Sequence, residues 1–475
     1  MMEQSPTDQS ELPLPMGVQE RTGALLPPLD PLALSKIDPA PSEVLQRGAT
    51  RGADRLAVSD IEPNNLTDAG WGVIFSSRAD PAVTKALGPL IEHRQQQVRD
   101  SRVFRIFEGK AGYEPGDTAR SWLAKSDVGL AVVDPYLGVP LYLLIVGGPD
   151  QIPFEFQYLL DTYWNVGRLA FDNPSDYGLY AARVIAYETA LTLPHRRRVA
   201  VFATKNPGDR ATGLMHDLLA KPLATGSDRR GHLGERQKFE IQALLGESAT
   251  RENLGDLMRG KMEGVPALLF SGSHGDFLEI GETDQRERQG AIICQNWKGG
   301  PVGRDMIFAG DDIPGDATLD GLIHILFACY SGGCPEFDNF RSPSSSPYRI
   351  SSGPFVARLP QKELTNGALA VLAHVDRAWS YSFLVGRSAP QTQEFRDLMV
   401  RIMKGERVGQ ATDQFNLRWA VLSSELADDE RARTLFPGEV SDIVMANRWI
   451  ARNDARNYLL FGDPAVRLRV EDMST

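Results

Sequence analysis

Short apolar runs alternate with helical patterns along most of this 475-residue chain, and this alternation constrains the fold more strongly than any other feature. Each run is short enough to be a strand that is buried on both faces of a sheet. Strands that alternate with helices predict a mostly parallel sheet covered by helices on both faces, which is an α/β fold. The expected strands cover residues 71–75, 141–146, 198–203, 239–245, 267–270, 322–328, 368–375 and 458–461.

Helical periodicity fills the intervals between these runs. From Phe395 to Met403, apolar residues recur with helical spacing, and Gly405 follows as a candidate C-terminal cap. A second apolar face begins at Leu214, and residues 81–99 also favour a helix. We interpret these stripes as core-facing surfaces and not as cofactor sites.

Length and composition agree with a globular protein that has room for large buried cores. Hydrophobic residues make up 42% of the chain and charged residues 24%, and the length suggests two or three domains or subdomains. The net charge of −11 argues against general nucleic-acid binding. No apolar stretch approaches the length of a membrane helix.

The N-terminal region and the cysteines bear on the cellular compartment. Residues 1–5 lack the basic and apolar parts of a secretory signal. Three cysteines cannot all pair, and a reactive thiol must stay reduced, so we expect a cytoplasmic protein. Residues 1–60 hold eight of the 31 prolines and show no apolar period, which predicts a largely irregular tail or linker. This tail is either a leader without a role or a propeptide or partner-docking segment.

Two reactive residues stand where expected strands end. His274 and Gly275 follow the run 267–270, and Cys329 follows the run 322–328. Because functional groups collect where parallel strands end, the imidazole and the thiol can meet as general base and nucleophile. The N–H groups of Gly275 and Cys329 are then candidates for an oxyanion hole, which requires close main-chain approach.

The order and spacing of these motifs resemble the caspase–gingipain group of cysteine peptidases, in which histidine precedes cysteine by about 50 residues. Residues 457–468 resemble the closing strand of gingipain-like catalytic domains, and residues 141–153 with 165–169 resemble an earlier gingipain pattern. The resemblance implies a bacterial caspase-like protease with a three-layer sandwich built from two side-by-side α/β subdomains. It also implies a non-catalytic subdomain over residues 61–235 and a catalytic subdomain over residues 236–475.

The expected activity is that of a cysteine endopeptidase that works through a thioester acyl-enzyme. His274 and Cys329 are the expected dyad, and the sequence does not identify a third residue that orients the histidine. Asp276 is interpreted as a solvated loop acid, and Cys294 as buried. The pattern of a zinc site is absent, as are the nucleotide-binding motifs, so we expect neither a metal nor a cofactor.

Specificity at P1, the residue before the scissile bond, is expected to depend on the strand that follows the cysteine. Asp376 there would favour Arg or Lys through a charge-assisted contact, and Trp379 resembles a pocket wall. The resemblance adds Glu155 and Asp161 as further acidic candidates. Arg377 pointing inward would instead favour an acidic P1 residue, as in caspases.

Regulation is expected because an unrestrained protease would find many exposed targets. The chain has two segments in which a cut would matter, and either could occupy the substrate groove until an upstream protease, the enzyme itself or a partner releases it. One is the serine- and proline-rich stretch after Cys334, and the other is the N-terminal tail. The candidate cleavage sites are Arg341, Arg349, Arg51 and Arg55.

Two alternatives to a regulated endopeptidase stay open. A peptidase-like scaffold could bind a partner without cleaving it, and a thiol acyltransferase or ligase could use the same acyl-enzyme. For the peptidase, the expected partners are protein or peptide substrates and an upstream activating protease or regulatory partner, with neither nucleic acid nor a membrane.

Overall fold

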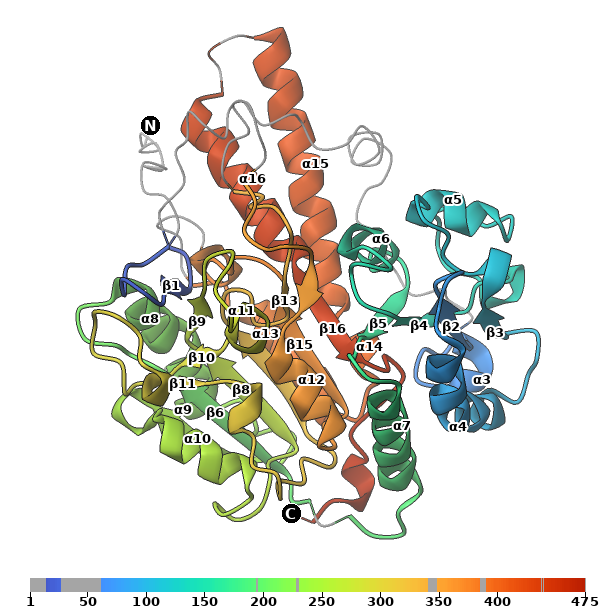
Figure 1. Ribbon diagram of the computed structural model, residues 1–475, viewed down its shortest axis with the longest axis horizontal. Helices are drawn as coiled ribbons and strands as arrows, with labels where there is room; N and C mark the ends of the chain where they lie inside the picture. Colours follow the sequence, from blue (N-terminus) through green and yellow to red (C-terminus); the bar gives the residue numbers. More distant parts are fainter. Residues whose placement is uncertain are drawn as a thin grey trace.

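The computed structural model describes residues 14–26, 61–193, 195–227, 230–340, 348–384, 390–436, 438 and 440–474. Within these ranges, ten strands form one continuous sheet that runs across the molecule (Figure 1). Its first half contains, in spatial order, β3 (Phe104–Phe107), β2 (Trp71–Phe75), β4 (Tyr142–Val146) and β5 (Asn165–Leu169). Its second half continues with β16 (Tyr458–Gly462), β15 (Ala370–His374), β12 (Ile323–Phe327), β8 (Leu268–Gly272), β6 (Arg198–Ala203) and β7 (Glu240–Leu245).

Nearly all neighbouring strands in this sheet are parallel, as the alternation of strands and helices predicted. The exception is the pair β15 and β16, which is antiparallel and aligns His374 with Tyr458. On its other side β16 lies parallel to β5, with Phe461 opposite Arg168. The last strand of the chain therefore joins the two halves of the sheet.

Alternate side chains of the central strands face two different apolar cores, which makes three layers. In β4, Leu144 packs into a core with α4 (Pro81–Val98) and α7 (Pro174–Thr189). Leu143, its neighbour, packs into a second core with α5 (Ala119–Ala124) and α6 (Phe154–Leu160). Because side chains along a strand point to opposite faces, this division places helices on both sides of the sheet, and the predicted α/β sandwich is confirmed.

The expected helices are present, and a further pair was not predicted. Residues 393–403 form α13 (Gln393–Met403), and Gly405 has a φ of +81°, as a C-terminal cap requires. Two long helices, α15 (Asp413–Leu435) and α16 (Asp442–Arg456), pack against each other and project from the body of the molecule (Figure 1). Within the described ranges, we find no helix with the length and apolar character that a membrane crossing requires.

The predicted boundary near residue 235 needs correction. It would separate β6 from β7, but these strands pair along their whole length, from Arg198 with Glu240 to Ala203 with Leu245. β6 also pairs with β8, so it belongs to the second half of the sheet. The division between the halves therefore falls after α7 and before β6, because strand pairing and not sequence distance defines a subdomain.

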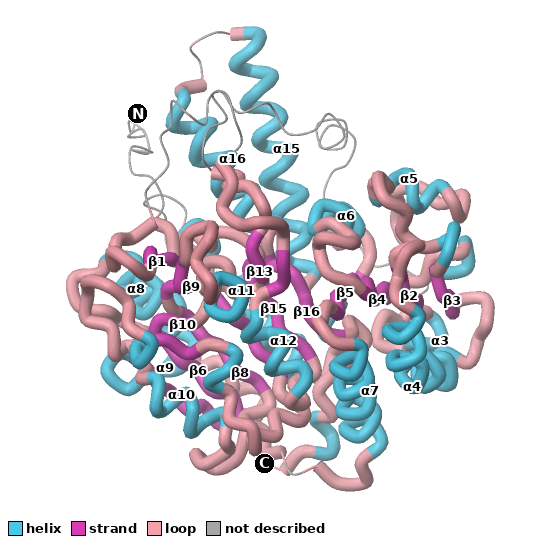
Figure 2. Tube along the Cα trace, in the orientation of Figure 1, coloured by secondary structure: helices cyan, strands magenta, loops and turns pink. Residues whose placement is uncertain are grey.

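The prediction of a largely irregular tail over residues 1–60 needs correction at residues 17–19, which form a strand. This strand, β1 (Gly17–Gln19), pairs with β9 (His274–Phe277) in a second, smaller sheet. β10 (Ile292–Ile293) and β11 (Ile307–Phe308) complete that sheet, which Figure 2 shows beside α8 (Arg210–Met215). Residues 1–13 and 27–60 of the tail lie outside the described residues.

Candidate active site

Three neighbouring strands end at one edge of the sheet, and each is followed by a residue that can take part in acyl transfer. β8 lies between β6 and β12, and all three are parallel. Asp209 follows β6, His274 follows β8 and Cys329 follows β12. Parallel strands place their carboxyl ends together, which explains why residues so far apart in the sequence share one site.

Asp209 orients the histidine. The Nε2 atom of His274 lies 2.6 Å from Oδ2 of Asp209, and since a carboxylate accepts, Nε2 donates. The Nδ1 atom of His274 is buried and has no hydrogen-bond partner among the described residues. The imidazole is therefore held in the tautomer whose Nδ1 lone pair is available as a base.

The position of Asp209 is itself fixed by the helix that follows it. Asp209 is the N-cap of α8, where its carboxylate accepts from the backbone N–H groups of Ala211 and Thr212 and from the Thr212 hydroxyl. Burial alone would raise the pKa of this carboxyl, but the hydrogen bonds from His274 and Thr212 outweigh that effect and lower it to about 2. Asp209 thus stays ionised beside the ring. Sequence reasoning missed this residue, because an acid that caps a helix after a strand indicates where the helix begins and not that it contacts His274.

The thiol of Cys329 is fully buried beside the next strand. Its Sγ atom accepts from the backbone N–H of Ala378 at 3.3 Å and donates to the Ala378 carbonyl at 3.5 Å. Burial raises the pKa of this thiol well above its ordinary value. Tyr330, which follows, has a left-handed φ of +57°, so the chain turns sharply directly after the cysteine. The thiol is therefore neutral while the site is closed.

The two N–H groups proposed for the oxyanion hole converge on one oxygen. The backbone nitrogens of Gly275 and Cys329 donate to the carbonyl oxygen of Met16, at 2.9 and 3.0 Å. Only glycine at position 275 lets its main chain lie this close to the main chain of Cys329, because a Cβ atom there would lie 1.9 Å from the Cys329 carbonyl oxygen. The two donors have the distances that stabilisation of an oxyanion requires.

The chain on the N-terminal side of Met16 lies antiparallel to residues 378–380. The Met16 N–H donates to the Ala378 carbonyl at 2.8 Å, and the Ser380 N–H donates to the Leu14 carbonyl at 3.0 Å. The Leu14 N–H also donates to the Ser380 hydroxyl at 3.1 Å, and Pro15 lies opposite Trp379. Residues 14–16 are therefore held by their main chain, as an added strand is.

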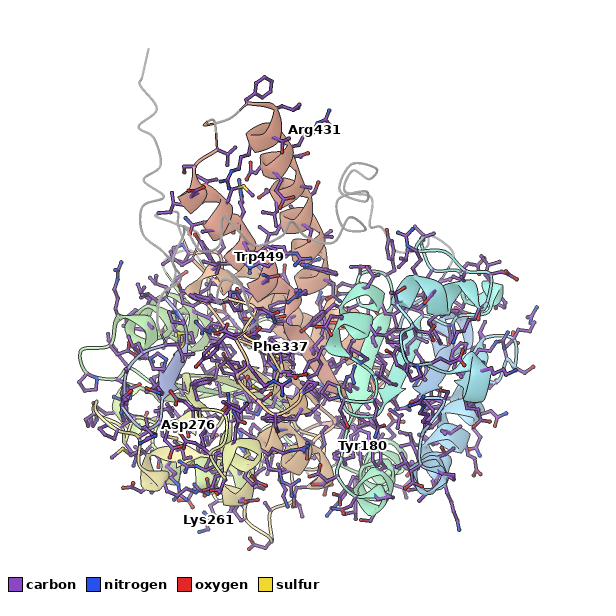
Figure 3. All side chains as sticks on the ribbon, turned by 45° about the horizontal axis from the view of Figure 1, so that its top comes forward. Tyr180, Lys261, Asp276, Phe337, Arg431 and Trp449 are labelled. Carbon is purple, nitrogen blue, oxygen red and sulfur yellow. The ribbon has the colours of Figure 1, made fainter. Side chains whose placement is uncertain are left out.

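The chain on the C-terminal side of Met16 covers the thiol. A Cβ atom on Gly17 would lie 3.0 Å from the Cys329 sulfur and 2.5 Å from the Leu26 side chain. The Leu26 N–H donates to the Gly17 carbonyl at 3.0 Å, which folds this segment back over the site. Glu20 is ion-paired with Arg288 at 2.9 Å. Figure 3 shows Asp276 beside this segment, where it pairs with β1 and is fully buried, contrary to the expectation of a solvated acid.

The structure places the P1 candidates Asp376 and Trp379 next to the cysteine, with partners of their own. Asn339 donates to the Asp376 carboxyl at 2.9 Å, and so does the Arg377 N–H at 2.7 Å. Burial raises the pKa of Asp376 to about 6, and Asp338 adds to this rise. The Trp379 ring packs against Phe340 with centroids 5.3 Å apart.

Arg377, which was considered for an acidic P1 preference, forms a buried ion pair with Asp338 at 2.5 Å. The other two acidic candidates lie in the first half of the sheet. Glu155 is exposed in the first turn of α6, and Asp161 is buried at its C-terminal end.

The remaining predicted residues fall into two groups. Cys294 and Cys334 are free and buried, and Cys294 is therefore confirmed as a core residue. Arg349 is exposed and paired with Glu336, in a segment where the strands Gly333–Cys334 and Phe355–Val356 pair. The other candidate cleavage sites lie outside the described residues: Arg341, Arg51 and Arg55. Among the described residues, no three potential metal ligands gather at one point.

A buried thiol, a carboxylate-bound imidazole and two convergent N–H groups are the parts that acyl transfer at a peptide carbonyl needs. The model of Peptidase family C25, the gingipain family, matches residues 79–469. The chain belongs to that family and is a cysteine-type peptidase, which is a hydrolase. Its fold is the caspase-like sandwich that the sequence predicted.

Solved structures with distant similarity were also found. The complex of the pro- and mature domains of Porphyromonas gingivalis RgpB is 13% identical, with a TM-score of 0.47, over 84% of this chain and 80% of that chain. A structure described as a protease is 12% identical, with a TM-score of 0.47, over 84% and 78%. The Saccharomyces cerevisiae separase–securin complex is 11% identical, with a TM-score of 0.28, over 68% and 16%. No curated protein sequence matched the chain.

Proposed function

We propose that the chain is a cysteine endopeptidase whose nucleophile is Cys329 and whose general base is His274. The observation that carries this proposal is the convergence of the Gly275 and Cys329 N–H groups on one carbonyl oxygen beside the thiol. A peptide carbonyl in that position is polarised by two donors and lies next to the nucleophile. The intact machinery argues against a silent peptidase-like scaffold.

The reaction follows from the roles of these groups. Nδ1 of His274 accepts the thiol proton, and the sulfur forms a bond to the carbonyl carbon while Gly275 and Cys329 bind the developing oxyanion. The C–N bond then breaks, and the imidazolium returns the proton to the leaving amine. Water hydrolyses the thioester and frees the thiol. Asp209 stabilises the imidazolium, because its own pKa is low enough to keep it ionised throughout.

The predicted preference for Arg or Lys at P1 depends on Asp376. In the closed state Asn339 and the Arg377 N–H already bind this carboxyl, so a cationic P1 side chain has to displace or share these donors. An acidic P1 side chain meets a similar barrier, because Asp338 already pairs with Arg377. Fluorogenic peptides that differ at P1 alone distinguish these preferences.

We further propose that residues 14–26 keep the peptidase inactive until a cut or a partner displaces them. The support is steric: the Met16 carbonyl of this segment already accepts from both N–H donors, and Cys329 is fully buried. An upstream protease or a regulatory partner is therefore the expected trigger. We also propose a cytoplasmic setting, since Cys329 must remain a free thiol to react.

The test of both proposals uses the full-length protein and a panel of peptides with Arg, Lys, Met, Leu or Asp at P1. Gly17→Trp should activate the enzyme toward these peptides, because a large side chain there cannot fit between Leu26 and the Cys329 sulfur. Gly315→Trp is the matched control, since a side chain at Gly315 meets open space. We expect turnover to rise in Gly17→Trp alone and to vanish when Cys329→Ala is added.

Two outcomes would contradict these proposals. A folded Gly17→Trp protein that hydrolyses no peptide, and that an electrophilic peptide does not label at Cys329, would favour the silent scaffold. Equal turnover by wild-type and Gly17→Trp protein, without delay, would reject the inhibitory role and leave a constitutive peptidase.

A further inference from the structure

We infer that Met16–Gly17 is a bond that this peptidase cleaves in its own chain, with Met16 as the P1 residue. The inference rests on the proposed function and goes beyond it, because it names the bond and the P1 side chain. In the proposed mechanism, the carbonyl that is attacked is the one that accepts from the two oxyanion donors. In this structure that carbonyl belongs to Met16, and its oxygen accepts from both Gly275 and Cys329.

The main chain around Met16 has the register of a substrate. The N–H of Met16 and the carbonyl of Leu14, two residues apart, both bond to the main chain of residues 378–380, which resembles the way an extended peptide binds an open strand edge. Leu14 then corresponds to P3, Pro15 to P2 and Gly17 to P1′. A Cβ atom on Gly17 would lie 3.0 Å from the Cys329 sulfur, so the sulfur lies beside the Met16–Gly17 peptide bond.

The S1 subsite, which receives the P1 side chain, holds an uncharged residue in this structure. Met16 is fully buried and belongs to the main apolar core. The charged residues that follow β15 already have partners: Asn339 donates to Asp376, and Asp338 pairs with Arg377. An unbranched apolar side chain therefore fits this subsite without leaving a buried charge unpaired. In this inference the basic P1 preference expected from the sequence gives way to methionine.

The P1′ position selects for glycine. A larger side chain at residue 17 would collide with Leu26 and with Cβ and Sγ of Cys329. The substrate class that the segment defines is thus an extended peptide with Leu at P3, Pro at P2, Met at P1 and Gly at P1′. This class differs from that of a trypsin-like specificity, in which a cation at P1 supplies the selectivity.

Cleavage here would release one side of the segment and retain the other. The sulfur bonds to the Met16 carbonyl carbon, the bond to the Gly17 nitrogen breaks, and His274 protonates that nitrogen; water then gives a Met16 carboxylate. Residues 1–16 lose their covalent anchor, whereas residues from Gly17 onward still pair with β9. Glu20 also still pairs with Arg288. We therefore expect a mature chain that begins at Gly17.

The test follows the mass and the new N-terminus of purified full-length protein over time. Wild-type protein should lose residues 1–16, and Cys329→Ala should stay intact. Met16→Leu should be cut at a similar rate, whereas Met16→Asp and Met16→Arg should each slow the cut by at least about tenfold, because a charge enters an apolar subsite. Arg51→Gln is the control, since it removes a basic site in the tail and should leave the rate unchanged.

A peptide assay on the same proteins separates this inference from the proposed function. Gly17→Trp protein should hydrolyse acyl-Leu-Pro-Met substrates faster than the Arg, Lys and Asp peptides. Faster cutting of Met16→Arg, a cut after an arginine instead, or an intact wild-type chain that hydrolyses peptides would overturn the inference and leave the peptidase. An intact chain with no peptide turnover and no labelling of Cys329 would overturn the proposed function itself.

Discussion

The two halves of the sheet share one architecture and differ in what stands at the ends of their strands. In the second half, β6, β8 and β12 lead to Asp209, His274 and Cys329. In the first half, the loop after β4 is closed by Arg168, whose buried guanidinium donates to the carbonyls of Gly147 and Ile152. The carboxyl ends of parallel strands thus form an edge in both halves. In the first half, buried polar side chains occupy that edge, and in the second half it holds the candidate catalytic residues. The fold supplies the edge, and the residues on it decide the chemistry.

The largest effect that tests this comparison is loss of the dyad. Cys329→Ala and His274→Ala should each lower kcat for peptide hydrolysis by about 10⁴-fold or more, because nucleophile and base act as one unit. Cys294→Ala removes another buried thiol, to which no catalytic role is assigned; it is the control and should retain most activity. Circular dichroism confirms that each variant is folded. Full turnover by folded Cys329→Ala protein would show that Cys329 is not the nucleophile and that the active site does not lie at this edge of the second half.

A smaller effect is expected from the orienting acid, and the first half offers a matched control. Asp209→Asn should lower kcat by between about 10² and 10⁴-fold, because the amide no longer fixes the imidazole tautomer or stabilises its cation. Asp150→Asn changes an exposed acid in the loop after β4 and should alter kcat less than about twofold. Equal losses in the two variants would contradict a specific role for Asp209 in orienting His274.

The residues of this site that can be recognised from their immediate neighbours in the sequence were predictable. Cys329 directly follows an apolar run, His274 comes four residues after another, and Gly275 stands next to the histidine, so neighbouring residues suffice to find them. The eight expected strands are all present within a few residues of their predicted ends. These features depend on burial and on residue type within a short window.

The parts that depend on strand order were not predictable. Asp209 reaches His274 only because β6 lies next to β8, and nothing near residue 209 in the sequence reports that neighbour. The same reason explains the misplaced boundary near 235. Residues 14–26 were missed because their order comes from main-chain bonds to β9 and to residues 378–380, and such bonds leave no apolar period in the sequence.

The seam between the halves provides the third test. Asp463, which follows β16, is fully buried and pairs with the equally buried Arg94 of α4 at 2.6 Å. It also accepts from the Trp71 indole N–H at 3.0 Å. Asp463→Ala removes one of the two carboxylates that pair with Arg94, while Glu188 keeps its ion pair at 2.6 Å. It also leaves the buried Trp71 N–H without its acceptor, and we expect a loss of about 1–3 kcal/mol in the free energy of unfolding.

Urea denaturation measures this loss, with Glu471→Gln as the control. Glu471 forms an exposed pair with Arg467 on the surface, and such pairs contribute about 0–1 kcal/mol. A cost for Asp463→Ala no larger than that of the control would mean that the halves are held together by packing of the sheet alone.

The smallest expected effect is that of pH on the equilibrium between the closed and released states of residues 14–26. Burial raises the pKa of Glu20 above its ordinary 4.5, despite Arg288, and burial also raises the pKa of the adjacent Asp276. Glu282 and Asp284 add to the rise for Glu20. The closed state therefore binds protons more tightly than the released state, in which solvent restores ordinary values, so acid favours closure and rising pH favours release.

Hydrogen exchange of β1 in Cys329→Ala protein measures this release without cleavage and without titration of the thiol. Once corrected for intrinsic exchange rates, protection of residues 17–19 should fall as pH rises above about 4.5, because rising pH ionises carboxyls whose pKa is raised only in the closed state. Glu20→Gln removes one of the titrating groups and should weaken the dependence of protection on pH. Glu279→Gln is the control: Glu279 accepts from Gln19 outside the Arg288 cluster, and its replacement should leave the pH dependence largely unchanged. If protection increased with pH instead, ionised carboxyls would favour the closed state. The Glu20–Arg288 ion pair, and not the cost of burying the carboxyls, would then control how tightly the segment covers Cys329.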